Sequence, residues 1–194
     1  IDEKIIALKL FIKENYVLNF LKSFIKFCSE ETEYQLLNYQ KTSVTLMLNF
    51  IKSIPNEHSE LCDQVMKIIG NLEAFEVCVY CSKEIPIGEQ VENVIECPEC
   101  HSDIERCSRT FLLINTPKTL NCDYCYSRSL VFSNEEPVEN PTKKVLDQAI
   151  FETSSMRYEF SWVKSHDSAC VYCRTPLNGL LTNDRVINYK QIKN

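Results

Sequence analysis

Four Cys-x-x-Cys pairs lie in the second half of the chain, and they constrain its fold more than any other feature. They are Cys78/Cys81, Cys97/Cys100, Cys122/Cys125 and Cys170/Cys173. Two such pairs supply the four ligands of a closed tetrahedral zinc site, so four pairs are enough for two sites. A disulfide framework needs an oxidising compartment, and we expect none because the chain has no recognisable signal segment. We therefore expect two structural zinc ions.

The two sites offer eight ligand positions, but the sequence contains ten candidate ligands. They are Cys78, Cys81, Cys97, Cys100, His101, Cys107, Cys122, Cys125, Cys170 and Cys173. Cys100 and His101 are adjacent in the chain, so their side chains diverge and we expect only one of them to reach a metal.

Two assignments of these ligands are open. If the sites interleave, the first zinc takes Cys78, Cys81, Cys122 and Cys125, and the second takes Cys170 and Cys173 with two of Cys97, Cys100, His101 and Cys107. The other assignment gives Cys107 to the first site and leaves Cys125 spare. Spacing alone does not choose between them.

The apolar residues predict a helical region before the cysteines. Over residues 1–76 they recur at helical spacing, with a polar break at residues 29–31 and a helix end at Pro55. Lys9/Lys13 and Lys22/Lys26 are each four residues apart and should form solvated stripes. We expect an α+β protein: an N-terminal helical bundle over residues 1–76, then a small RING-like or zinc-ribbon-like domain with two zinc sites over residues 77–194.

Within the second part, short β-rich runs alternate with the cysteine pairs, one of them at residues 110–114. Residues 133–142 are acidic, contain two prolines and are expected to form a loop. Cys28 and Cys62 lack ligand partners and are expected to be small buried apolar residues. Trp162 is expected to pack in the core.

Composition narrows the classes of function. The formal net charge of −6 is the wrong sign for neutralising phosphates, so we expect DNA to be contacted only indirectly. The three glycines are far apart, which disfavours a phosphate-cradling loop for a nucleotide or coenzyme A. No apolar run is long enough to cross a membrane. Closed zinc sites leave no open position for a catalytic water, so we expect neither an enzyme nor a small-molecule substrate.

The run from Cys97 to Phe111 resembles the zinc-finger domain at the C-terminal end of a subunit of transcription factor IIIC, the WD-repeat-bearing subunit of the 90-kDa type. The shared elements, in order, are Cys78/Cys81, Cys97 and His101, Arg106-Cys107, Thr110-Phe111, Cys122, Trp162-Val163-Lys164 and Cys170/Cys173. The resemblance covers roughly residues 77–178. This chain departs from the family in having Cys100 where the family has glycine, and in a gap from His101 to Arg106 that is one residue longer.

The resemblance implies a nuclear, non-enzymatic interaction module whose partners are the other subunits of the transcription factor IIIC complex. That complex recognises internal promoters of tRNA and related genes and recruits the RNA polymerase III machinery. In the family a WD-repeat propeller precedes this region; the chain begins at Ile1 rather than Met, and we expect it to be part of a longer protein. Histone acetyltransferase activity has been attributed to a family member, which the dispersed glycines here do not support. The alternative is a RING-like ubiquitin ligase, which would also bind two zinc ions with interleaved ligands.

Overall fold

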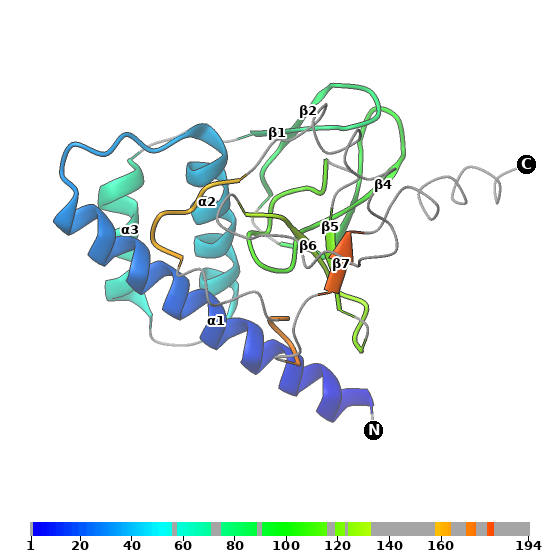
Figure 1. Ribbon diagram of the computed structural model, residues 1–194, viewed down its shortest axis with the longest axis horizontal. Helices are drawn as coiled ribbons and strands as arrows, with labels where there is room; N and C mark the ends of the chain where they lie inside the picture. Colours follow the sequence, from blue (N-terminus) through cyan, green and yellow to red (C-terminus); the bar gives the residue numbers. More distant parts are fainter. Residues whose placement is uncertain are drawn as a thin grey trace, which may run out of the picture.

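The computed structural model describes residues 2–55, 58–70, 75–88, 91–115, 119–122, 124–132, 158–163, 170–173 and 178–180. The loop expected at residues 133–142 lies outside these described residues. Three helices come first in the chain and occupy one side of the molecule, and the short strands occupy the other (Figure 1). The expected α+β fold class is confirmed.

The helices are α1 (Asp2–Glu30), α2 (Asn38–Ser53) and α3 (Ser59–Ile69), and each packs against the other two. Gln40 fixes the start of α2, because its side-chain oxygen accepts the N–H of Leu37 at 2.9 Å while its amide donates to the carbonyl of Glu159 at 2.7 Å. Pro55 follows α2 and cannot continue its hydrogen bonds. Gly70, with φ of +68°, caps the C-terminal end of α3. These ends agree with the helices that the sequence predicts.

The strands form three small antiparallel sheets. β1 (Phe75–Val77) pairs with β2 (Glu84–Pro86), and β3 (Val94–Glu96) pairs with β4 (Asp103–Glu105). The third sheet has the order β6-β5-β7, formed by β5 (Thr119–Asn121), β6 (Arg128–Leu130) and β7 (Asn178–Leu180). Each strand is three residues long, so these sheets bury little apolar surface by themselves.

One hydrophobic core joins the helices to the part of the chain that contains the cysteine pairs. Val17, Phe24 and Met47 from the helices belong to the same buried cluster as Phe111 and Leu130. Trp162 lies within this core as expected. Its ring contacts those of Phe20, Phe24, Phe27 and Phe160, with ring centroids 5.0–5.8 Å apart. The expected division at residues 76/77 falls inside β1 and stays a prediction, because the two parts share a core.

A buried ion pair joins β1 to the segment that follows β4. Glu76, on β1, accepts hydrogen bonds from the guanidinium of Arg106 and from the backbone N–H of Leu113. Arg106 also donates to the carbonyl of Phe111 at 2.8 Å. Both charged side chains are more than nine-tenths buried. Such a pair is costly to break, because one charge is then left buried without a partner.

The long helix α1 corrects one sequence expectation. Lys9, Lys22 and Lys26 are exposed as expected, but Lys13 is buried and its ammonium donates to Asn93 at 3.0 Å. The same ammonium lies over the rings of Phe50 and Phe111, 4.9 and 4.4 Å from their centroids. A lysine can be buried this way because two aromatic faces and an amide oxygen replace part of its hydration. None of the described helices is long and apolar enough to cross a membrane.

Candidate metal centres

Three of the cysteine pairs occupy the turns of three β-hairpins with the same geometry, here called knuckle hairpins. The first cysteine of each pair follows the first strand directly, and the strand-end pairs Val77↔Glu84, Glu96↔Asp103 and Asn121↔Arg128 are each seven residues apart. The carbonyls of Cys78, Cys97 and Cys122 accept the backbone N–H of the residue four positions later, at 2.9–3.0 Å. The turn therefore holds both sulfurs of a pair on one side of the hairpin.

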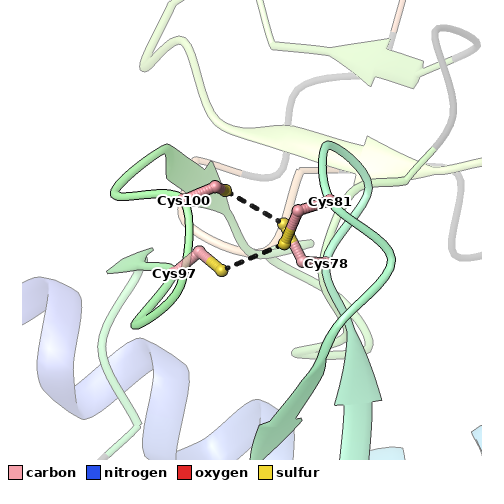
Figure 2. Close-up of side chains that lie close together, drawn as sticks. All are labelled: Cys78, Cys81, Cys97 and Cys100. Atoms are coloured by element: carbon pink, nitrogen blue, oxygen red, sulfur yellow. Dashed lines mark hydrogen bonds between the residues drawn. The ribbon is translucent and has the colours of Figure 1, made fainter.

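The first cysteine group consists of Cys78, Cys81, Cys97 and Cys100. The β1–β2 and β3–β4 hairpins point these side chains toward one another (Figure 2). Cys78 and Cys97 belong to the same small buried cluster as Ile85 and Ile104. The Sγ atoms of Cys78 and Cys100 are 3.6 Å apart, and those of Cys81 and Cys97 are 3.7 Å apart. All four sulfurs lie within 4.8 Å of one another.

The second cysteine group consists of Cys122, Cys125, Cys170 and Cys173. Strand β7 follows the last pair and hydrogen-bonds to β5, which precedes Cys122, and this pairing brings the two pairs together. The sulfurs of Cys122 and Cys173 are 3.1 Å apart, and those of Cys125 and Cys170 are 3.3 Å apart. Ser127 Oγ lies 3.1 Å from the sulfur of Cys170.

The interleaved pairing, one of the two assignments that the sequence leaves open, is wrong. Cys78/Cys81 meets Cys97/Cys100 rather than Cys122/Cys125, and Cys170/Cys173 meets Cys122/Cys125. The alternative that leaves Cys125 spare is also wrong, because Cys125 belongs to the second group. The reason is topological: the first group joins two hairpins that follow each other in the chain, whereas the β5–β7 pairing defines the second. The spacing between the cysteines shows neither which hairpins pack together nor that β5 pairs with β7.

Within the described residues, His101 and Cys107 belong to neither group. The His101 ring points to Glu96 instead, with Nδ1 2.8 Å from the carboxylate, and both side chains are mostly exposed. Cys107 is buried in the main core, where its sulfur accepts the backbone N–H groups of Thr110 and Leu130 at 3.4 and 3.2 Å.

The Cys107 turn is a fourth knuckle hairpin that lacks the second cysteine. Arg106 pairs with Leu113 seven residues later, and the Cys107 carbonyl accepts the N–H of Phe111 at 2.9 Å. Thr110 stands where the other three hairpins have their second cysteine. Residues 110–114 therefore form a turn and a single bridge rather than the expected β run. The turn contacts the helices through hydrogen bonds from Ser43 Oγ to the Thr110 carbonyl at 2.6 Å and from Tyr16 to the Arg109 carbonyl at 2.9 Å.

The donor sets fit zinc. A Zn–S bond of about 2.3 Å places the sulfurs of a tetrahedron about 3.8 Å apart. The first cysteine group has that spacing, and the second is more compact and would expand slightly around an ion. Soft thiolates without oxygen ligands favour zinc over magnesium or calcium.

The electrostatics of the two groups also favour a bound cation. Hydrogen bonds from the side chain and backbone of Ser102 lower the pKa of Cys100 to about 6, whereas burial raises the pKa of Cys170 to about 12. Four sulfurs this close cannot all ionise without a positive charge between them. A divalent metal supplies that charge and releases the thiol protons as it binds.

Comparison with known proteins agrees with a zinc-binding role. The family described as "Putative zinc-finger of transcription factor IIIC complex" matches residues 59–177, which is more than half of the chain. The match begins at the start of α3 and includes both cysteine groups and the Cys107 hairpin. No curated protein and no solved structure matches the chain.

Proposed function

Because the chain belongs to the zinc-finger family of the transcription factor IIIC complex, we propose that it is a non-enzymatic interaction module of that complex, acting in RNA polymerase III transcription of tRNA and related genes. The proposed module binds two structural zinc ions, one in each cysteine group. Its partners are the other subunits of the complex in the nucleus, and it contacts DNA only through them. The parent subunit is proposed to be the WD-repeat-bearing one of the 90-kDa type.

One observation carries this proposal: each cysteine group has four sulfur ligands that surround a single point. A zinc ion bound by four thiolates has no open position for water or substrate, so it stabilises a fold rather than catalysing a reaction. In this chain that fold is a set of three-residue strands packed on helices, which needs the stability that zinc binding gives. Such sites therefore support a role as a scaffold for protein interactions.

The RING-like ubiquitin ligase is not favoured. A RING interleaves its ligand pairs along the chain, whereas here consecutive pairs meet in each group. An in vitro discharge assay with a panel of ubiquitin-conjugating enzymes tests this point. We expect no discharge above that of a variant with Cys97→Ser, and robust zinc-dependent discharge would restore the ligase hypothesis.

The proposed function is tested by purification from cells. The tagged chain should co-purify with transcription factor IIIC subunits, and crosslinked chromatin should be enriched in tRNA genes. Cys97→Ser and Cys122→Ser each remove one metal ligand and should abolish co-purification, whereas Cys62→Ser, a cysteine outside both groups, should retain it. Purification of the folded, zinc-loaded chain without any subunit of the complex would refute the proposal.

A further inference from the structure

A groove of about 670 Å³ lies between the N-terminal half of α1 and the knuckle hairpins. One wall is the helix, with Ile6, Leu10 and Lys13. The other wall comes from the region of β3, β4 and β6. A groove of this volume accommodates several side chains of a bound segment.

The walls of the groove expose apolar side chains to solvent. Ile6 is 64% exposed, Leu10 46% and Val94 45%, and Tyr126 projects from the turn of the third knuckle hairpin with 74% of its surface exposed. Contiguous apolar surface rimmed by polar residues is typical of a protein-binding site. Ile6 and Leu10 lie one turn apart on the same face of α1, which gives two neighbouring positions for apolar anchors.

The charge of the groove is opposite in sign to that of the chain. Four cationic side chains line it, Lys9, Lys13, Arg106 and Arg128, against the two carboxylates of Glu92 and Glu105. The chain as a whole has a net charge of −6. Arg128 is already paired with Glu105 at 2.8 Å, and Arg106 with the buried Glu76, which leaves Lys9 and Lys13 against Glu92. Lys9, which is exposed and makes no ion pair with any described residue, is the charge most accessible to a partner.

We propose that this groove binds an acidic, amphipathic segment of a partner protein, whose apolar side chains contact Ile6, Leu10 and Val94 while a carboxylate pairs with the exposed Lys9. The inference rests on the proposed role as an interaction module and names the surface that performs it. A nucleic acid fits less well, because Glu92 and Glu105 repel phosphates and the α1 wall is aliphatic, whereas single strands stack their bases on aromatic rings.

The test uses the full zinc-loaded chain and a short synthetic peptide in which Asp and Glu alternate with Leu and Phe, followed by fluorescence anisotropy. Lys9→Glu and Ile6→Ser should each weaken binding about tenfold, because the first reverses a steering charge and the second removes an apolar contact. The matched controls Lys22→Glu and Ile5→Ser change the same residue types on α1 outside the groove, and should leave affinity within about twofold. All four positions are exposed, and circular dichroism checks that each variant folds.

Four further measurements decide between occupants. A peptide with Lys in place of its acidic residues, and one with Ser in place of its apolar residues, should both bind at least about tenfold more weakly. Tighter binding of oligothymidylate than of the acidic peptide would overturn the inference in favour of nucleic acid. A homodimer in sedimentation velocity that Ile6→Ser dissociates would overturn it in favour of a second copy of the chain.

The outcomes separate this inference from the proposed function. Equal loss of peptide affinity in groove and control variants, with co-purification intact, would refute the groove alone. Groove-specific peptide binding by a chain that co-purifies with no subunit of transcription factor IIIC would refute the proposed function and support the groove.

Discussion

Cys100 and His101 are neighbours in the chain with opposite surroundings. The Cys100 sulfur lies 3.6 Å from that of Cys78, inside the first cysteine group, whereas the His101 ring lies on the surface beside Glu96. His101 has φ of +57°, a left-handed conformation that is uncommon for residues other than glycine. The backbone thus directs Cys100 inward and His101 outward.

The zinc content of two variants shows which of these two residues is a metal ligand. Cys100→Ser removes a thiolate ligand and should reduce the bound zinc from two ions per chain to about one. His101→Ala removes only an exposed contact with Glu96 and should keep both ions. Inductively coupled plasma mass spectrometry of the purified variants measures the zinc directly. Loss of an ion in the histidine variant alone would mean that His101 is the ligand.

Lys13 is a buried charge at the junction between α1 and the zinc-binding part. Burial lowers its pKa to about 8 from an ordinary value of 10.5, and the charge of Arg106 lowers it in the same direction. In the unfolded chain the ammonium stays protonated up to about pH 10.5. Between these values the unfolded state therefore binds more protons than the folded state, so Lys13 makes the free energy of unfolding rise with pH.

This dependence is measurable against a variant without the charge. As the pH rises from about 8 to about 10.5, the wild type should gain stability relative to Lys13→Met, whereas below about pH 8 the difference should be constant. Lys9→Met, the same substitution at an exposed lysine one turn earlier, is the matched control. Urea unfolding across this pH range provides the measurement. A parallel pH dependence in wild type and Lys13→Met would show that Lys13 does not titrate in this window.

At the scale of elements, the knuckle hairpin is the repeated unit of this fold. It occurs with its first cysteine at Cys78, Cys97, Cys107 and Cys122, and in all four the residue four positions later has a positive φ, between +57° and +64°. These residues are Ser82, His101, Phe111 and Tyr126. Three of the four hairpins contribute to a cysteine group, and the Cys107 hairpin packs into the main core instead.

The positive φ shared by the four hairpins predicts how the fourth residue after the first cysteine responds to substitution. Ser82 is exposed with φ of +60°, so Ser82→Gly should stabilise the fold by about 0.5–1 kcal/mol. Ser82→Val should destabilise it by more than about 1 kcal/mol, because β-branched residues are least tolerant of positive φ. Chemical unfolding of the zinc-loaded protein measures both. A more stable valine variant than glycine variant would contradict the left-handed turn.

Some of these elements follow from sequence and others do not. Apolar periodicity, the polar break at residues 29–31 and Pro55 predict the helical region, and the cysteine pairs predict two metal centres. The Cys107 hairpin has no second cysteine to reveal it, although the chain continues Thr110-Phe111 at the spacing of the other turns. The burial of Lys13 could not be predicted either, because it depends on Phe50 and Phe111, which lie 37 and 98 residues further along the chain.

For the whole molecule, the shared core couples metal binding to the helices. Trp162 is the single tryptophan of the chain and lies between Phe20, Phe24 and Phe160, eight residues before the zinc-ligand candidate Cys170. Loss of the second cysteine group should therefore disturb the environment of an indole that packs on α1.

Removal of zinc should unfold more than the knuckle hairpins. Zinc binding contributes roughly 10–16 kcal/mol in small zinc-stabilised domains, which exceeds the net stability of about 5–15 kcal/mol of an ordinary domain. We expect a strong chelator to shift the fluorescence of Trp162 to longer wavelength together with zinc release, and added zinc to reverse the shift. An unchanged emission after both ions are lost would show that the core is independent of the metal.

The bridge between Phe132 and Tyr158 has a consequence for how this protein can vary in length. The two residues pair directly, and both are buried in the main core, so two positions that are 26 residues apart in the chain are held side by side. Doubling the length of a flexible loop costs only about 0.6 kcal/mol in closure entropy. Changing the number of residues between Phe132 and Tyr158 therefore changes the entropy of closing this bridge only slightly.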